Sequence, residues 1–266
     1  MDPIAQFKEN AKQGWSSFTP TEIATASTAP RLVRYAGIAR GMEVLDVGCG
    51  TGVVALTAAR LGARVTGVDL TPKLLERAKQ NAAIMNLQVE WHEDDVEALP
   101  LDDAKFDVVV SQFGHMFAPR ADIATKEMLR VLKPGGTIAF STWPPELLVG
   151  RMFGLIGKYA PPPPPGFSPP SLWGDPNTVR ERLGNAVRNL NFDRDVMRFQ
   201  ALSIQHDRLF MEASIGPIAK LVEALSTSDP DKLATLRREF EELTALYFED
   251  NHVRQDYLLT RAIKVS

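Results

Sequence analysis

Short runs of apolar, β-branched residues alternate with helical stretches between residues 41 and 142. The runs predict five strands, at 43–47, 64–68, 88–92, 106–111 and 137–142. The stretches between them predict helices at 52–61, 72–85 and 121–132. The runs lack polar alternation, as expected of parallel strands that are buried on both faces. The repetition predicts an α/β fold with a doubly wound parallel sheet.

The two flanks of this region are less regular. Residues 1–40 form a helical lead-in that Pro20 and Pro30 are expected to break, with a helix at 29–40. The five consecutive prolines Pro161–Pro165 exclude helix and interior strand. We therefore interpret 143–171 as an insertion that leaves the sheet edge, with a short helix at 147–158.

The C-terminal part is expected to complete the same domain. Asp175 precedes Pro176 and should cap a helix that ends near Leu183. The remaining expected elements are a strand at 195–204, helices at 218–225 and 232–248, and a strand at 257–265. The organisation is thus a lead-in (1–40), a cofactor-binding core (41–142), an insertion and helix near the substrate cleft (143–190), and the last strands with inserted helices (191–266).

The first expected strand ends in Asp46 and runs directly into a loop with Gly48, Gly50 and Gly52. Glycine permits positive φ and lets a ligand approach the backbone without a Cβ clash. The free N–H groups of the following helix point toward the same place. We therefore expect a ligand at this edge of the sheet.

The loop alone leaves the ligand open. Counted from Gly48, the strict dinucleotide fingerprint G-x-G-x-x-G puts its last glycine where Val53 stands. Counted from Gly50, its last position is Ala55, which only the looser form of the fingerprint tolerates. A tight strand–helix turn without a ligand is a further interpretation.

Two aspartates follow the next strands. Asp69 closes the second expected strand, where a carboxylate can accept from both hydroxyls of a ribose. Its alternative role is a cap on the helix that begins at Thr71 and Pro72. Asp95 follows the third strand and could accept from the exocyclic amine of adenine, or belong to a solvated acidic turn.

Five segments, in order, resemble class I S-adenosylmethionine-dependent methyltransferases, in particular the small-molecule branch with ubiquinone and menaquinone C-methyltransferases. The segments are 44–52 (VLDVGCGTG), 67–71 (GVDLT), 95–100 (DVEALP), 106–114 (FDVVVSQFG) and 129–136 (LRVLKPGG). The resemblance implies S-adenosyl-L-methionine as cofactor and S-adenosyl-L-homocysteine as its product. It also implies a Rossmann-like, mostly parallel seven-stranded sheet with a C-terminal antiparallel strand.

The resemblance assigns roles by position. Asp69 would hold the ribose, the residues after it and after the third strand would surround adenine, and the end of the fourth strand would lie near the sulfonium. The implied cofactor-binding residues are Asp46, Gly48, Cys49, Gly50, Thr51, Gly52, Asp69, Leu70, Asp95, Val96, Gln112 and Phe113. The chain departs from the family at Asp94, where a small residue is usual, and at His115, where an aliphatic residue is commoner.

Methyl transfer from a sulfonium is an in-line displacement, and alignment can supply about 7–11 kcal/mol of its acceleration. His115 follows the fourth strand and is the candidate general base, because histidine titrates near neutrality. Its alternative role is to line the pocket. Aromatic side chains are expected to form a wall over an apolar or aromatic substrate, or to pack the insertion onto the sheet. Around the insertion they are Trp143, Phe167 and Trp173. Trp15 and Phe18 of the lead-in are further candidates for the substrate site and could also fold over the cofactor.

Composition narrows the class of partner and leaves two other functions open. The 266 residues carry 30 basic and 33 acidic side chains, a balance that disfavours a nucleic-acid partner. The single cysteine, Cys49, excludes an intrachain disulfide and a multi-cysteine metal site, and no metal is expected. No signal peptide or membrane span is visible, so we expect a cytoplasmic protein with a small-molecule substrate. A nicotinamide-dependent oxidoreductase and a non-catalytic cofactor-binding module are the alternatives.

Overall fold

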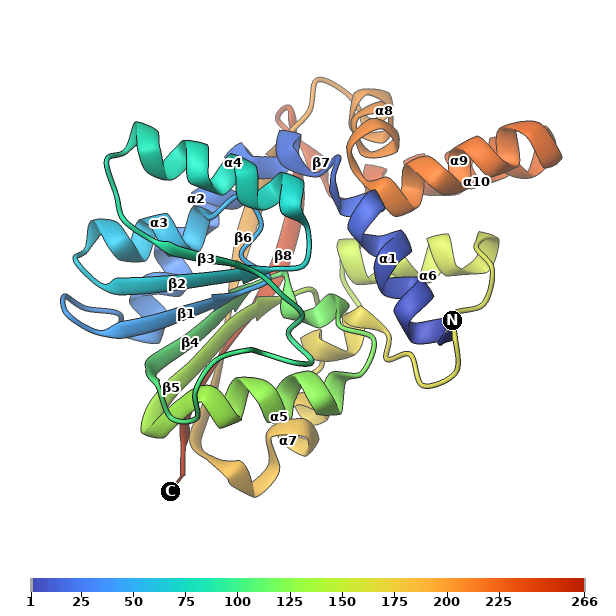
Figure 1. Cartoon of the computed structure of the whole chain (residues 1–266). Coiled ribbons are helices and arrows are strands. Elements are labelled where there is room, and N and C mark those ends of the chain that lie inside the picture. Colours follow the sequence, from blue (N-terminus) through green and yellow to red (C-terminus); the bar gives the residue numbers. More distant parts are fainter. Residues whose placement is uncertain (1, 266) are drawn as a thin grey trace.

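Eight strands form one mixed sheet in the computed structural model, which describes residues 2–265 (Figure 1). The order is β3-β2-β1-β4-β5-β8-β6, with β7 paired to β8. Strands β1 to β5 are mutually parallel, and β8 runs antiparallel to its neighbours. The strands are β1 (Glu43–Val47), β2 (Arg64–Asp69), β3 (Glu90–Glu93), β4 (Phe106–Gln112), β5 (Leu132–Thr142), β6 (Val187–Gln200), β7 (Phe248–Glu249) and β8 (His252–Lys264).

The predicted Rossmann-like sheet is confirmed, with the two-residue strand β7 as an addition. Helices cover both faces, with α2, α3 and α4 on one side and α5 and α7 on the other (Figure 1). The helices are α1 (Pro3–Trp15), α2 (Glu22–Ala36), α3 (Val53–Arg60), α4 (Pro72–Ile84), α5 (Ala121–Val131), α6 (Leu148–Tyr159), α7 (Pro176–Leu183), α8 (Ile204–Ser214), α9 (Gly216–Ser228) and α10 (Pro230–Ala245). Short 3-10 turns are η1 (Thr19–Thr21), η2 (His115–Phe117), η3 (Pro170–Gly174) and η4 (Gly184–Ala186).

The expected helix break at Pro30 is wrong. Helix α2 runs through Pro30 and ends at Gly37, whose φ of +74° terminates it. The helix buries Ala29, Leu32 and Val33 on the face that meets α3 and β5. This burial offsets the hydrogen bond that proline removes, so tertiary packing overrides the local signal.

The sixth strand begins earlier than expected. Strand β6 starts at Val187 and pairs with β8 to Gln200, and most of its side chains are exposed or half-buried. The edge position of β6 hides it from a search for buried apolar runs. The expected strand end at Ile204 is instead the start of α8, where the Ser203 hydroxyl accepts from the His206 amide N–H. Helix α8 was not expected.

Helices α1, α6, α8, α9 and α10 gather beyond the sheet and form what we term the helical cap (Figure 1). Helix α1 packs on α9 so closely that a Cβ added to Gly216 would lie 2.0 Å from the carbonyl oxygen of Gly14. Helix α10 packs on both α6 and α8. The first helix of the chain therefore belongs structurally to the segment inserted between β6 and β8.

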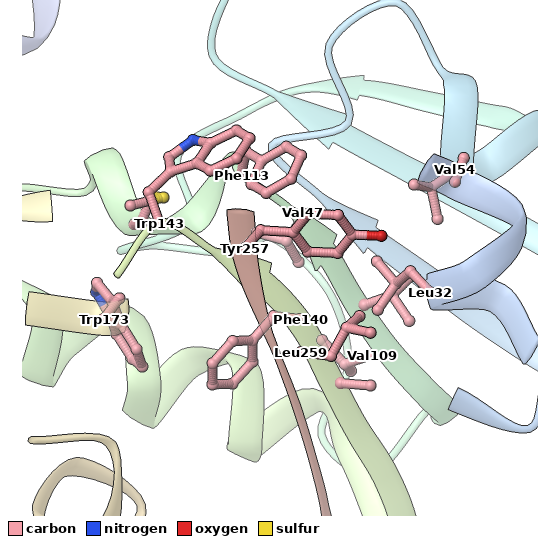
Figure 2. Packing of buried hydrophobic residues seen from close by; sticks show 14 of the residues in the cluster. Leu32, Val47, Val54, Val109, Phe113, Phe140, Trp143, Trp173, Tyr257 and Leu259 are labelled. Carbon is pink, nitrogen blue, oxygen red and sulfur yellow. The ribbon is translucent and has the colours of Figure 1, made fainter. Parts of the chain in front are cut away.

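A buried aromatic group joins the last strands to the end of β4. Figure 2 shows Phe113 stacked on Trp143, with a centroid separation of 3.8 Å, and Tyr257 edge-on to Phe113 at 5.5 Å. Trp173 and Phe140 form a second pair at 5.4 Å. Such pairs contribute about 0.5–1.5 kcal/mol each beyond area burial and hold the strand ends in place.

Among residues 2–265, no helix combines the length and apolar character that crossing a bilayer requires.

Candidate functional site

The glycine loop after β1 adopts the conformation that the sequence predicts. Gly48, Gly50 and Gly52 have φ of +62°, +54° and +82°, values that disfavour any side chain. A Cβ on Gly48 would lie 2.8 Å from Cα of Gly114, so this glycine permits two backbones to meet. A Cβ on Gly50 would meet nothing within 4 Å. Gly50 therefore faces open space, as a backbone that contacts a ligand should.

Asp46 lies buried beneath the loop with one oxygen unused. Its Oδ2 accepts from the Ala55 N–H at 2.9 Å, and its Oδ1 has no hydrogen-bond partner. Burial raises the pKa of Asp46 to about 8, because the carboxylate is removed from water without a counter-charge. A cationic or hydrogen-bond-donating ligand at Oδ1 would relieve this desolvation.

Asp69 sits at the tip of β2 and ties the loop to the next helix. Its Oδ2 accepts from the Gly50 N–H and its Oδ1 from the Thr71 N–H, both at 2.8 Å. Burial raises the pKa of Asp69, although these two bonds act in the opposite direction. Each carboxylate oxygen keeps a lone pair for a further donor. Leu70, the next residue, is half-buried beside it.

Asp95 lies in the turn after β3, within an ion-pair network. Its Oδ1 accepts from the Glu97 N–H at 2.9 Å, and its Oδ2 lies 2.5 Å from Lys8 Nζ. Glu97 pairs with the same Lys8 and with Arg120. Val96 is half-buried between the two acids. The sequence analysis did not include Lys8, because the partners are 87 residues apart and no local pattern links them.

The end of β4 supplies a second unused acceptor. Gln112 Nε2 donates to the Thr25 carbonyl at 2.8 Å, while its buried Oε1 has no partner. Phe113 follows with φ of +58°, a conformation uncommon outside glycine, and its ring faces Trp143. Residues held in such backbone regions often lie at functional sites.

Cys49 and Thr51 support the loop from beneath. The Cys49 N–H donates to the Val68 carbonyl at 3.0 Å, and burial raises the pKa of its thiol well above the usual range. The Thr51 carbonyl accepts from Asn81 at 3.2 Å. The side chains of both residues are buried, so the two residues present mainly their backbone to the open side of the loop.

These groups fit the expected cofactor. The open face of Gly50 leaves room for a ligand. The unused oxygens Asp46 Oδ1 and Gln112 Oε1 need donors, which the ammonium and hydroxyl groups of S-adenosylmethionine can supply. The carboxylates of Asp69 and Asp95 stand at the tips of neighbouring strands. The structure therefore brings the predicted residues to one edge of the sheet.

The geometry does not support His115 as the general base. The side chain is 1% exposed, packs 4.6 Å from both Phe140 and Trp173, and neither ring nitrogen has a partner. Burial, with a smaller effect from the Arg182 charge, lowers the pKa of His115 to about 3. A histidine of such low basicity is neutral at pH 7 and poorly suited to proton abstraction.

The expected aromatic wall is only partly formed by the expected residues. Trp143 and Trp173 are 6% and 1% exposed and belong to the core, which favours the alternative that they pack the insertion onto the sheet. Half-buried Trp15 contacts Phe18 at 5.5 Å and Phe117 at 4.6 Å. Phe117, in the turn after β4, was overlooked although it stands two residues beyond His115.

Phe153 extends this wall, and Phe7 and Phe167 form a separate pair. Phe153 of α6 lies 5.8 Å from Phe117, and Phe167 lies 5.1 Å from Phe7 of α1. All four rings are half-buried. The aromatic surface thus joins the end of β4 to the helical cap.

Comparisons with known proteins agree with this geometry. A family model described as "Methyltransferase domain" matches residues 44–136. An uncharacterized protein of Mycobacterium tuberculosis is 38% identical over 248 residues, which cover 91% of this chain and 89% of the relative. Demethylmenaquinone methyltransferase of Staphylococcus aureus is 40% identical over 138 residues, covering 50% of this chain and 56% of that protein.

Solved structures resemble the whole fold. The YcgJ protein of Bacillus subtilis has a TM-score of 0.61 at 19% identity, covering 90% of this chain and 99% of the other. Phosphoethanolamine N-methyltransferase 2 of Haemonchus contortus has a TM-score of 0.58 at 16% identity, covering 90% of this chain and 53% of the other. The likeness therefore includes strands and helices outside residues 44–136.

Proposed function

Because the chain belongs to the class I S-adenosylmethionine-dependent methyltransferases, we propose that it methylates a small apolar or aromatic metabolite. The acceptor atom is an oxygen, nitrogen or carbon nucleophile. The observation that carries this proposal is the half-buried aromatic surface of Trp15, Phe18, Phe117 and Phe153. Apolar pockets with a few polar groups are typical of small-molecule sites.

The proposed cofactor contacts follow from the unused groups at the sheet edge. Asp69 accepts from the ribose hydroxyls, and Gly50 lies against the same portion. Asp95 and the backbone at Val96 bind the adenine edge. Asp46 and Gln112 accept from the methionine end, which the unpartnered Asp46 Oδ1 and Gln112 Oε1 support.

In the proposed reaction, bound S-adenosylmethionine supplies a methyl group on an activated sulfonium. The chain holds the acceptor in line with that methyl, and aromatic rings favour the nearby positive charge. Phe117 and Trp15 exclude water from the acceptor. Proton removal by His115 is not part of this proposal, because its pKa of about 3 makes the ring a weak base.

A relative's name supports the aromatic acceptor. Demethylmenaquinone methyltransferase of Staphylococcus aureus matches half of this chain, and its name indicates a quinone-type substrate. We extend to this chain only the class, an apolar ring compound with a nucleophilic atom.

The test is a transfer screen with S-adenosylmethionine that carries a labelled methyl group. Phenols, quinols, amines and carboxylates are the acceptors, and Asp69→Ala is the control that should lose transfer. We expect label on an apolar aromatic acceptor. Transfer only to polar, charged acceptors would contradict the aromatic-substrate proposal. Tight binding of NAD with no affinity for S-adenosylhomocysteine would instead favour the oxidoreductase alternative.

A further inference from the structure

Two lysines of α1 face three carboxylates at the end of β3 and in the turn after it, where the adenine of the cofactor is proposed to bind. Lys8 and Lys12 are four residues apart and so share one face of the helix. Lys8 Nζ lies 2.5 Å from both Asp95 Oδ2 and Glu97 Oε2, and Lys12 Nζ lies 2.6 Å from Glu93 Oε1. The helix therefore docks on this turn through charge.

The two lysine contacts differ in burial. The side chain of Lys8 is 15% exposed, and those of its partners Asp95 and Glu97 are 27% and 1% exposed. The Lys12 and Glu93 side chains are 26% and 46% exposed. An exposed pair contributes little to stability, whereas a desolvated pair orients its members strongly. Lys12 is thus a natural control for Lys8.

Asp95 depends on Lys8 more than Glu97 does. Glu97 keeps the Arg120 side chain and the Arg120 N–H, both at 2.7 Å, when Lys8 is removed. Asp95 Oδ2 has no other donor among the described side chains than Lys8. Without Lys8, rotation of the Asp95 carboxylate would be limited only by the Oδ1 bond to the Glu97 N–H.

We propose that Lys8 is a positioning residue for cofactor binding, which fixes Asp95 in the orientation that accepts from the exocyclic amine of adenine. The inference rests on the proposed role of Asp95. Since a carboxylate oxygen has two lone pairs, Oδ2 can hold Lys8 and the amine together. Lys8 acts through Asp95 and does not itself contact the reacting atoms.

Helix α1 thereby links the turn after β3, which contains Asp95, to the other helices of the helical cap. The Ser17 hydroxyl donates to the Ser214 carbonyl, and Lys220 Nζ donates to the Asn10 carbonyl, both at 3.1 Å. With the Gly14–Gly216 contact, these bonds fasten α1 and the residues just after it to the end of α8 and the start of α9. Orientation of Asp95 is therefore tied to the position of the cap.

The test is calorimetric titration with two ligands, S-adenosylhomocysteine and its hypoxanthine analogue, in which a carbonyl oxygen replaces the exocyclic amine. Variants are Lys8→Met, Lys8→Arg, Lys12→Met and Asp95→Ala, each checked for an unchanged melting temperature. We expect Lys8→Met to weaken S-adenosylhomocysteine about tenfold, as loss of a charge-assisted hydrogen bond does, and to reduce the preference for the amine. Lys8→Arg should retain the preference for the amine, because it keeps the positive charge, and Lys12→Met should also leave that preference unchanged.

A double variant separates positioning from general docking of α1. Lys8→Met should have no further effect in the Asp95→Ala background, because its influence passes through Asp95. Equal weakening of both ligands by Lys8→Met, or equal effects of Lys8→Met and Lys12→Met, would overturn the inference. If Asp95→Ala leaves the preference for the amine unchanged, the assignment of Asp95 fails and Lys8 with it. If Asp95→Ala abolishes that preference while Lys8→Met retains it, the Lys8 inference alone fails.

Discussion

The cofactor edge, by which we mean the ends of β1, β2 and β4 with the loops that follow them, differs from the helical cap in its contacts. The first relies more on backbone groups and the second more on side chains. At the ends of β1, β2 and β4, backbone N–H groups and carboxylates hold one another, and two buried oxygens, of Asp46 and Gln112, lack partners. In the cap, rings and ion pairs of side chains supply many of the contacts, beside the close backbone approach that holds α1 on α9. Backbone geometry constrains the ligand tightly, whereas side chains are easily exchanged. We infer that the first region is specific for the cofactor and the second sets acceptor choice.

The largest expected effect is from Asp69→Ala, at the centre of the first region. The variant removes the acceptor for the Gly50 and Thr71 N–H groups as well as the proposed ribose contact. We expect affinity for S-adenosylhomocysteine to fall about a hundredfold or more, the size of two charge-assisted hydrogen bonds. Calorimetric titration measures this. Affinity within a few-fold of the parent chain would contradict the ribose assignment.

Two glycines with similar backbone conformations test whether the open space beside Gly50 is the place where the cofactor binds. Gly50 and Gly135 have φ of +54° and +76°, and a Cβ on either would meet nothing within 4 Å. Replacement of either by alanine should cost about 1–2 kcal/mol of stability, because both are left-handed. Only Gly50→Ala should also weaken S-adenosylhomocysteine, by about tenfold or more, since its methyl group enters the ligand space. Equal binding in both variants would place the ligand elsewhere.

The same contrast explains what the sequence could predict. The glycine loop, Asp46 and Asp69 can be found from local sequence, since each lies at or directly after the end of a strand. The hydrogen-bond partners of both aspartates are backbone N–H groups in and around the loop. The burial of Trp173 depends on η3 reaching β5, where the Thr142 hydroxyl donates to the Trp173 carbonyl at 2.9 Å. The Lys8 contact likewise joins distant segments. Periodicity therefore predicts the sheet, the loop and several helices of the cap, including α6, α9 and α10, but not how the cap helices pack against one another and against the sheet.

Trp15→Ala tests the second region. Loss of its contacts with Phe18 and Phe117 should raise KM for the acceptor found in the transfer screen by about tenfold, because apolar contact area is lost. Affinity for S-adenosylhomocysteine should change less than about twofold. Phe210→Ala is the matched control, because its ring packs 5.0 Å from Phe199 and away from the other rings named here. An equal rise of KM in both variants would mean that the cap acts only through stability.

The stability of the cofactor-free protein should fall as pH rises, because of Asp46. Its folded pKa of about 8 exceeds the unfolded value of about 3.9, so the folded state retains a proton that the unfolded state releases. The contribution of Asp46 to the free energy of unfolding is fully present below about pH 4 and is lost by about pH 8. Between these values the free energy of unfolding falls by up to about 1.4 kcal/mol per pH unit. Urea unfolding at several pH values measures the slope.

Asp46→Asn should flatten this slope, because the amide does not titrate. Asp107→Asn is the control, since ordinary pairing with Lys133 lowers the pKa of Asp107 and moves its titration below this window. An unchanged slope in Asp46→Asn would show that the carboxyl is ionised in the folded chain and that another group supplies the needed charge.

His115→Gln should have the smallest effect on catalysis, although His115 is only one residue from the glycine loop's contact at Gly114. A general base contributes about 10²–10⁴-fold, so a catalytic His115 would lose at least a hundredfold in kcat and one limb of the pH profile. We expect kcat within about threefold of the parent, because the neutral His115 ring is a buried packing residue against Phe140 and Trp173.

The pH dependence of unfolding separates these two roles for His115. Its folded pKa of about 3 lies below the unfolded value of about 6.5, so its contribution to stability is full above about pH 6.5 and is lost as pH falls toward 3. The glutamine variant should therefore lose less stability than the parent chain between pH 6 and pH 4 in urea titrations, whatever its effect at pH 7. A normal kcat, together with this smaller loss of stability in acid, identifies His115 as a buried packing residue. Loss of the acidic limb of the kcat profile, with unchanged sensitivity of stability to acid, would identify a general base. It would also move His115 from the packed core to the functional site.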